Sequence, residues 1–417
     1  MSSFSIPLSG LDATQQALNV ISNNLANLNT TGFKDQTANF QDLFYQNFGT
    51  TGAGDPIQVG AGSEIAAISS NFTNGSLNST GVPSDVAITG NGFFIVQDPN
   101  GTVEYTRSGD FGVNSQGQLV TVSGQTVMGY PAVAGVVNQS APLAPLQVGQ
   151  SAISPPAAST TMQQQTNLDA SAQVGDSFSS PLTVYDSLGT PHVLSFTYAN
   201  TGPGAWTYQI TLPAADTGGT GNPTVIASGN LTFDSNGNLT SPSGSVTGIN
   251  ITGLADGAAT MNLTWNLTGN GGSSLLTQVD APSATTSTQQ NGYGSGTLQS
   301  YTVASDGTIE GQFSNGQVQA LGQIALANFA NPQGMQLTGG DSYAPTLASG
   351  GAVIGAPNTG TLGTLTGGAL ESSNVNISSE FTNLIVVERA FQADARMITT
   401  LDTVTSTTIN LQATPGN

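Results

Sequence analysis

The chain has 417 residues, enough for two to four domains, and its formal net charge is −20 because four Lys and Arg residues oppose 24 Asp and Glu residues. So few cations exclude the basic stripe that nucleic-acid binding needs, and they make an anionic membrane surface an unfavourable partner. No apolar run is long enough for a transmembrane helix. The lack of cysteine excludes disulfides and thiol chemistry. Polarity comes from Ser, Thr, Asn, Gln and 53 Gly, which is typical of a hydrated, β-rich protein.

The first predicted element is an N-terminal helix whose apolar residues recur every seven positions. A capping-box pattern places its start at Ser9, and Gly32 suits a left-handed C-terminal stop. Heptad spacing predicts that one side of the helix is buried against a partner helix. The residues expected to pack are Leu11, Leu18 and Leu25 in one row, with Ile21 and Leu28 beside them.

The middle of the chain is predicted to be β structure. Residues 33–70 are aromatic and Gly-rich and predict an extended connector, whereas short apolar strands separated by Asn-Gly and Asp-Gly turns begin at about residue 71. Low-complexity segments at 151–166 and 281–297 bracket a middle region that contains both tryptophans. The predicted fold class is therefore mainly β with terminal α-helices: nested β domains of sandwich or barrel type plus a helical coiled-coil domain.

The domain prediction follows from these boundaries and from the match between the two ends. Its parts are a terminal helical coiled-coil domain at 1–32 and 372–417, an extended connector at 33–70 and 356–371, a core β domain at 71–150 and 298–355, and an inserted outer β domain with flanking linkers at 151–297.

The last predicted element is a helix from about Ser378 to Gln412, because no proline interrupts this stretch. Its predicted packing residues are Phe381, Leu384, Phe391, Ile398 and Leu401. An amphipathic helix can also cover the core of its own domain, but neither terminal helix adjoins a strand that it would obviously cover. We therefore expect the seams of both helices to pack between copies of the chain.

The two arginines of the C-terminal helix add to this expectation. Neither Arg389 nor Arg396 has an acidic residue three or four positions away, where intrahelical pairs form. We expect each to meet a carboxylate elsewhere, with Glu388, Asp394 and Asp402 of other copies as candidates; the alternative is that both face water.

Several segments resemble the axial proteins of the bacterial flagellum, the rod and hook proteins. Residues 21–34 are similar to their N-terminal signature, and residues 90–96 and 105–111 to their core β domain. Residues 184–192 resemble a middle-domain segment typical of hook proteins, and residues 373–375 and 389–393 the C-terminal block. These matches lie at both ends and in the middle, so the resemblance covers most of the chain.

The resemblance implies a structural subunit rather than an enzyme, polymerising into a curved tube that links the flagellar motor to the filament. It further implies export through the flagellar type III apparatus without a cleaved signal peptide and an extracellular location in the basal body and hook. The implied partners are copies of the chain and the rod, hook-cap and hook–filament junction proteins. A straight distal rod protein, and a secreted β-rich adhesin or glycan-active enzyme, remain as alternatives.

A search for chemistry predicts no catalytic, cofactor or metal site. His192 is the only histidine, and although Asp186 is near it in sequence, a lone histidine in a strand turn is more often structural. The Asp234–Asn238 segment lacks the Gly and Glu of a calcium loop and predicts a hairpin. The remaining acidic candidates are interpreted as turn residues: Asp85, Asp98, Glu104 and Asp110.

Overall fold

The computed structural model describes residues 4–52, 54–149, 152–269 and 271–412. The protein is mainly β with one long helix at each end, which confirms the predicted fold class. The chain forms two compact units: unit 1 contains Met1–Gly149, Ser300–Gly311 and Gln319–Asn417, and unit 2 contains Gln150–Gln299 and Gln312–Val318. Both terminal helices thus belong to the same unit as the first β region.

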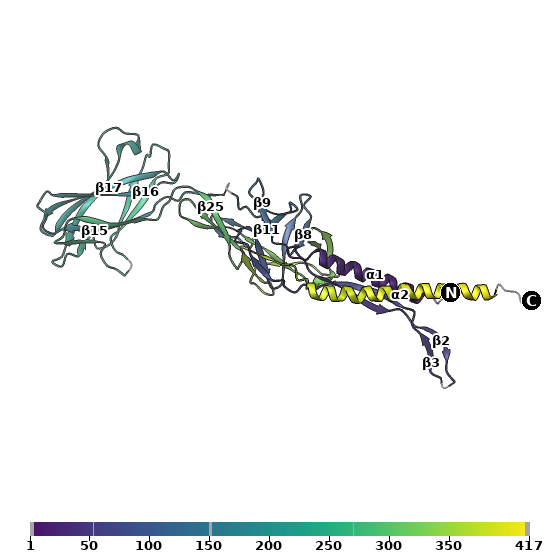
Figure 1. Cartoon of the computed structure of the whole chain (residues 1–417). Coiled ribbons are helices and arrows are strands. Elements are labelled where there is room, and N and C mark those ends of the chain that lie inside the picture. The colour runs from purple at the N-terminus through teal and green to yellow at the C-terminus, as the bar shows by residue number, and fades with distance from the viewer. Residues whose placement is uncertain (1–3, 53, 150–151, 270, 413–417) are drawn as a thin grey trace, which may run out of the picture. The chain divides into compact units, whose positions relative to one another are not determined.

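Unit 1 holds the two helices, α1 (Ser5–Ala26) and α2 (Ile377–Gln412), which lie side by side in Figure 1. The helix α1 begins four residues before the predicted Ser9, and its C-cap is Asn27 rather than a residue near Gly32. The helix α2 starts where Asn376 Oδ1 accepts hydrogen bonds from the amides of Ser378 and Ser379, at 3.0 and 3.1 Å. This side chain satisfies two of the free amides that every helix start presents.

The residues of the predicted extended connector after α1 form two antiparallel strand pairs. Strand β1 (Gln36–Asp42) pairs antiparallel with β4 (Ser63–Ser70), and β2 (Gln46–Thr50) pairs with β3 (Pro56–Val59) between them. Figure 1 shows β2 and β3 as a separate two-stranded arm. Most of the described side chains on these strands are exposed or half-buried, so the hairpins have no core of their own.

The rest of unit 1 is a β domain whose central strands are β7 and β11, joined antiparallel. Its core contains Val86, Phe94, Val127, Ile324 and Leu326, all fully buried or nearly so. The strands are β5 (Leu77–Ser79), β6 (Val86–Thr89), β7 (Phe93–Gln97), β8 (Val103–Thr106), β9 (Phe111–Val113), β10 (Leu119–Thr121), β11 (Thr126–Val133), β12 (Val136–Val137), β13 (Ala144–Pro145), β28 (Leu326–Asn328), β29 (Gln336–Gly339), β30 (Ser342–Ala344), β31 (Val353–Gly355), β32 (Thr364–Gly367) and β33 (Ala369–Glu371).

The last two strands tie the C-terminal side of unit 1 to its N-terminal side. Strand β32 pairs with β6, and β33 pairs with β5, both antiparallel. The chain therefore enters α2 directly from strands that are paired with the segment following the N-terminal hairpins. Strands β25 (Gly296–Val303), β26 (Thr308–Phe313) and β27 (Val318–Ile324) contain residues of both units.

Unit 2 is a β sandwich of two five-stranded sheets. One sheet has the antiparallel order β16-β17-β18-β19-β20, and the other has the order β21-β22-β15-β23 with β24 also paired to β15. The bounds are β14 (Ile153–Ser154), β15 (Thr161–Asp169), β16 (Ser177–Tyr185), β17 (Pro191–Gly202), β18 (Ala205–Leu212), β19 (Thr224–Phe233), β20 (Leu239–Ser241), β21 (Val246–Ile251), β22 (Met261–Asn266), β23 (Leu276–Val279) and β24 (Ala284–Gln290).

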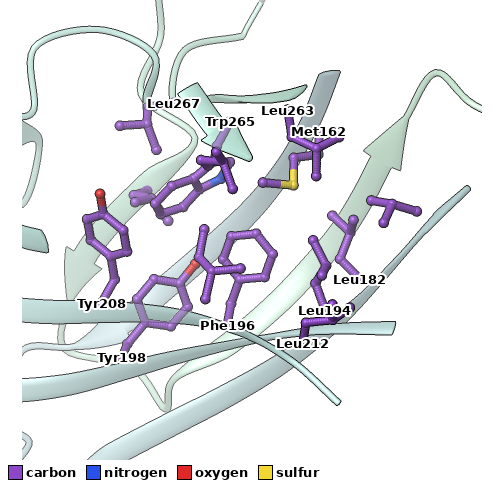
Figure 2. Packing of buried hydrophobic residues seen from close by; sticks show 14 of the residues in the cluster. Met162, Leu182, Leu194, Phe196, Tyr198, Tyr208, Leu212, Leu263, Trp265 and Leu267 are labelled. Carbon is purple, nitrogen blue, oxygen red and sulfur yellow. The ribbon is translucent and has the colours of Figure 1, made fainter. Parts of the chain in front are cut away.

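The core of unit 2 lies between these sheets. Along β17, buried residues alternate with exposed or half-buried ones, as expected of a strand with one face in the core. Figure 2 shows Phe196 of β17, Tyr208 of β18 and Trp265 of β22 converging in this core. The ring centroid of Trp265 lies 5.1 Å from those of both Phe196 and Tyr208, in edge-to-face geometry. Both tryptophans are buried here, so tryptophan fluorescence reports on unit 2 alone.

Candidate functional site

The terminal helices form the candidate site, and they first pack against each other. A Cβ atom at Gly10 of α1 would lie 2.8 Å from Asp394 Oδ2 of α2, so glycine permits this close approach. The face of α1 buried within the chain carries mostly small residues: Ala13, Thr14, Ala17, Val20, Ile21 and Asn24. Two helices separated in sequence by 350 positions therefore meet inside one chain. Of the residues predicted to pack on α1, only Ile21 lies on this buried face.

The predicted leucines lie on a different side of α1. Leu11, Leu18 and Leu25, called here the leucine row, are each half-buried, as is Leu28. With 100° per residue, the row points about 130° away from the buried alanine face. Ile21 is already buried, with 7 % of its surface exposed, so its burial needs no second chain.

On α2 the predicted residues fall mainly on the side that faces α1. Helical geometry places Leu384, Phe391 and Ile398 on the same side as Asp394, and all three are half-buried, as is Leu401. Phe381 is 51 % exposed. The sequence reasoning missed a second apolar line about 140° away from Leu384, Phe391 and Ile398. It is called here the outer stripe, and its exposed members are Val386, Met397, Val404 and Leu411. The heptad spacing of the last three was the signal that could have found it.

An apolar groove opens beside the paired helices. It is lined by Ala17 and Val20 of α1, Ala38 and Phe40 of β1, and Val386 of α2. Phe40 and Val386 are 49 % and 62 % exposed, so large apolar side chains border the groove without a cover in the monomer. A groove of this kind can accept an apolar side chain of similar size.

Asn24 fixes α1 to the first hairpin. Its side-chain amide donates to the carbonyl of Gln36 at 2.7 Å and to Glu380 Oε2 at 3.4 Å, and its Oδ1 accepts from the amide of Gln36 at 2.9 Å. Asn24 is fully buried. One side chain thus satisfies both backbone groups of Gln36 and contacts α2, which sets the direction of β1 relative to both helices.

A buried ion-pair cluster anchors the base of the helices to the β domain. Lys34 Nζ lies 2.7 Å from Glu371 Oε1 and donates to the carbonyl of Thr73 at 2.8 Å. The guanidinium of Arg107 approaches Glu371 Oε2 at 3.6 Å and lies over the ring of Phe93. Burial lowers the pKa values of Lys34 and Arg107, while the Glu371 carboxylate opposes both shifts.

Gly32 belongs to the same anchor. Its φ is +72°, and a Cβ atom would lie 2.6 Å from the carbonyl carbon of Arg107, so both the backbone angle and the space require glycine. Its amide donates to the carbonyl of Glu371 at 2.8 Å. The structure therefore assigns Gly32 to this contact rather than to the end of α1.

The two arginines of α2 have no such partner. Within the described residues, neither Arg389 nor Arg396 forms an ion pair, and both are exposed. Arg389 makes a long 3.5 Å contact with Gln392 Oε1. The third basic residue near the helices, Lys34, pairs inside its own chain with Glu371, which the sequence reasoning did not consider.

In unit 2 the single histidine has a carboxylate on each side. His192 Nε2 lies 3.0 Å from Asp186 Oδ2, and Nδ1 lies 3.0 Å from Asp216 Oδ2. Burial lowers the pKa of His192, but the hydrogen bonds to Asp186 and Asp216 outweigh burial and raise it overall. Burial likewise raises the pKa of Asp186, while hydrogen bonds from Asp256, His192 and backbone amides lower it to about 2.

Asp85 and Asp98 make local contacts, whereas Glu104 lies within strand β8, so its interpretation as a turn residue is wrong. Asp234 Oδ1 accepts from the amides of Asn236 and Asn238, which confirms the hairpin. Asp85 accepts from Thr80 and Glu104 from Gln125, while Asp98 accepts from Asn100.

Comparison with known families gives four consecutive matches. Residues 6–34 match the flagella basal body rod protein family, and residues 87–167 match the flagellar hook protein FlgE/F/G D1 domain. Residues 157–293 match the flagellar basal body protein FlaE D2 domain, and residues 366–411 match the flagellar basal body rod FlgEFG protein C-terminal family. The matches cover nearly all of both helices, the part of the β domain of unit 1 that begins at residue 87, and the sandwich of unit 2, while residues 294–365 lie outside them.

Curated relatives extend over nearly the whole chain. The flagellar hook protein FlgE of Salmonella typhimurium strain LT2 is 37 % identical over 98 % of this chain and 100 % of its own length. That of Treponema pallidum strain Nichols is 33 % identical over 97 % and 98 %. A crystal structure of the Helicobacter pylori flagellar hook protein FlgE2 covers 71 % of this chain and all of that chain, at 16 % identity and a TM-score of 0.49.

The chain is thus an axial protein of the bacterial flagellum. Within that class it belongs to the flagellar hook protein family. Among the described residues, neither helix is both long enough and apolar enough to cross a membrane.

Proposed function

We propose that this chain is the structural subunit of the bacterial flagellar hook and assembles with itself into a curved, flexible tube that transmits motor torque to the filament. The observation that carries the proposal is the end-to-end match to hook proteins, which includes the sandwich of unit 2 as well as both terminal helices. A distal rod protein is the second reading, since the rod-family matches cover the two ends.

The proposed mechanism is assembly rather than catalysis. The pairing of α1 with α2 leaves the leucine row half-buried and the outer stripe exposed, so the helix pair presents apolar surface on two further sides. Burying that surface between copies would stabilise the polymer by about 25 cal/mol for each Å² of apolar area removed from water. Neighbouring helix pairs would then form the wall of the tube, with the groove beside β1 receiving an apolar side chain of the next copy.

The proposed partners follow from this role. They are other copies of the chain, the rod below it, the hook cap during growth and the hook–filament junction proteins above it. Delivery is proposed to occur through the flagellar type III export apparatus without a cleaved signal peptide, to an extracellular position in the flagellar basal body and hook.

The test is electron microscopy of the purified full chain, concentrated stepwise from dilute solution. Curved tubes are the expected product, since curvature separates a hook from a straight shaft. Uniformly straight tubes would favour the distal rod reading, and a chain that stays monomeric at high concentration would contradict both. A variant with Leu18→Asp places a charge in the leucine row and is expected to remain monomeric.

A further inference from the structure

The strongest feature outside the assembly surfaces is the surroundings of His192 in unit 2. His192 and Asp186 are 4 % and 0 % exposed, and a carboxylate oxygen lies 3.0 Å from each ring nitrogen. The carboxylate on the Nδ1 side belongs to Asp216. A third acidic residue, Asp256, lies near Asp186 and the Nε2 side of the ring. None of these residues belongs to the helices or the groove of the proposed assembly surface.

The geometry on the Nε2 side matches a metal ligand set. One ligand atom from each of Asp186, His192 and Asp256 lies within 4.8 Å of the other two. Ligands bound tetrahedrally at about 2.0–2.2 Å from one ion lie roughly 3.3–3.6 Å apart, so closure by up to about 1.5 Å would complete the site. Asp256 is exposed and can supply that movement, whereas Asp186 and His192 are held in the core.

The charges around the ring call for a cation. Unit 2 contains no Lys or Arg, so His192 is the only side chain there that can carry a positive charge. A carboxylate oxygen lies 3.0 Å from each of its ring nitrogens, and the Asp256 carboxylate lies within 4.8 Å of the ligand atoms of Asp186 and His192. Carboxylates this close together are costly to keep charged without a cation among them. A single proton on the imidazole leaves most of this negative charge unbalanced, whereas a divalent ion offsets it.

The supporting contacts orient the ligands as metal sites require. Asp216 Oδ2 is placed to accept the Nδ1 proton of His192. If an ion replaced the Nε2 proton, this contact would hold the ring with the Nε2 lone pair directed at Asp186 and Asp256. Asp186 Oδ1 accepts from the amides of Leu188 and Thr190 at 2.8 and 2.9 Å, so its Oδ2 is fixed toward the ring. A carboxylate on the far nitrogen is the usual outer partner of a metal-binding histidine.

We propose that Asp186 Oδ2, His192 Nε2 and the Asp256 carboxylate bind a first-row divalent transition-metal ion such as Zn²⁺, with Asp216 as the positioning residue behind the imidazole. The imidazole favours this class over Ca²⁺ and Mg²⁺, which prefer ligand sets made only of oxygen. Water would fill the remaining position on the exposed Asp256 side. The ion would join the β16–β17 turn to the loop between β21 and β22.

The test uses the full chain in dilute solution after removal of metals with a chelator. Titration with Zn²⁺ by calorimetry is expected to give one site per chain. Because His192 is the only histidine, the long-range ¹H–¹⁵N NMR spectrum of histidine-labelled protein reports on this ring alone. Zn²⁺ is expected to shift the Nε2 resonance and leave Nδ1 protonated, and to raise the melting temperature of the tryptophan-monitored transition.

Two variants and one control make the assignment specific. Asp256→Asn removes an exposed ligand and is expected to weaken Zn²⁺ binding at least tenfold. Asp216→Asn is expected to weaken it about 10–100-fold and to disturb the Nδ1 signal, as loss of an outer partner does. Asp280→Asn, an exposed acidic residue of the same unit, should leave binding unchanged.

Three results would overturn the proposal. The first is an imidazole spectrum that millimolar Zn²⁺ does not alter, which would assign the site to a proton alone. The second is equal Zn²⁺ affinity in the wild type and Asp256→Asn. The third is equal or tighter binding of Ca²⁺ or Mg²⁺, which would contradict the proposed class of ion.

Discussion

Lys34 Nζ lies 2.7 Å from Glu371 Oε1, although 337 positions separate the two residues in the sequence. Both side chains are fully buried, and Glu371 also accepts from the amide of Gly75 at 2.8 Å. The pair joins the segment that leaves α1 to the strand that leads into α2. The buried ion pair therefore connects the base of the helix pair to the β domain of unit 1, in addition to the backbone contacts there.

The first prediction concerns this pair. Glu371→Gln leaves Lys34 and Arg107 as buried cations without a counter-charge, so we expect unit 1 to lose about 3–5 kcal/mol of unfolding free energy. Lys34→Met should cost less, because Arg107 still faces Glu371 at 3.6 Å. Calorimetric unfolding measures the loss, and the tryptophan-monitored transition of unit 2 is an internal control.

Glu310→Gln is the matched control for Glu371→Gln, because Glu310 is an exposed glutamate of the same unit. Its unfolding free energy should stay within about 0.5 kcal/mol of the wild type. Equal stability of Glu371→Gln and the wild type would show that the cluster contributes nothing to the fold.

Much of the fold could be read from the sequence because it depends on local patterns. Strand alternation and Asn-Gly turns identify β structure, and an uninterrupted run without proline identifies α2, which the structure begins at Ile377, one residue before the predicted Ser378. The pairing of β33 with β5 and the contact between Lys34 and Glu371 could not be read in this way. They join segments far apart in sequence, and neither partner carries a local signal for the other.

The candidate site was only partly predictable, for a related physical reason. A heptad row indicates that one side of a helix is apolar. It does not indicate whether the surface that covers this side belongs to the same chain. In α1 the close approach to α2 is made at Gly10, and the small residues Ala13 and Ala17 are buried, while the larger leucines remain half-buried to one side. Large apolar residues dominate a hydrophobic pattern, so the small-residue face escaped notice.

The second prediction tests the leucine row. Leu18→Ala or Leu25→Ala should raise the critical concentration for assembly strongly or abolish it, since truncating a packed leucine costs about 2–5 kcal/mol at every repeat. The monomer should melt as the wild type does, because the row is only half-buried within the chain. Sedimentation at increasing concentration measures assembly.

Leu347→Ala controls for the loss of a leucine in the same unit, because Leu347 is fully exposed and lies away from the helices in the sequence. It should assemble normally. If Leu18→Ala and Leu347→Ala polymerise alike, the leucine row does not pack between copies.

The third prediction concerns the exposed arginines of α2. Arg389→Ala or Arg396→Ala should weaken assembly without changing the stability of unit 1, because neither residue has an ion pair among the described residues of its own chain. An exposed intermolecular pair contributes up to about 1 kcal/mol, or roughly a fivefold change in critical concentration. Raising the salt concentration should reduce the difference between wild type and variants. Wild-type assembly by both variants would place the arginines in water.

The fourth prediction concerns alkaline pH and unit 2. Burial raises the pKa of Tyr198 above its usual value of about 10, and its hydroxyl donates to Gln164 Oε1 at 3.1 Å. The stability that this phenol contributes is present below pH 10 and is lost above it, because only the unfolded chain then ionises. At pH 11 this amounts to about 1.4 kcal/mol.

Tyr198→Phe removes that titration. Urea unfolding followed by tryptophan fluorescence should show that the variant loses about 1.4 kcal/mol less than the wild type between pH 9 and pH 11. The comparison of slopes cancels the constant cost of losing the hydrogen bond to Gln164. Parallel pH profiles for the two proteins would mean that Tyr198 ionises in the folded state as readily as in the unfolded chain.

The last prediction concerns Asn24 and the attachment of α1. Asn24→Ala removes both hydrogen bonds to the backbone of Gln36 and the contact with Glu380, and leaves buried polar groups without partners. We expect α1 and β1 to separate from each other in the monomer while the β domain stays folded. Limited proteolysis should then cut the N-terminal 35 residues or so faster than in the wild type, by about tenfold for a loss near 1.4 kcal/mol. Asn19→Ala, an exposed asparagine of the same helix, should be cut at the wild-type rate. If Asn24→Ala and Asn19→Ala are equally resistant, α1 is held by its contact with α2 alone, and the hairpin can move without releasing the helix.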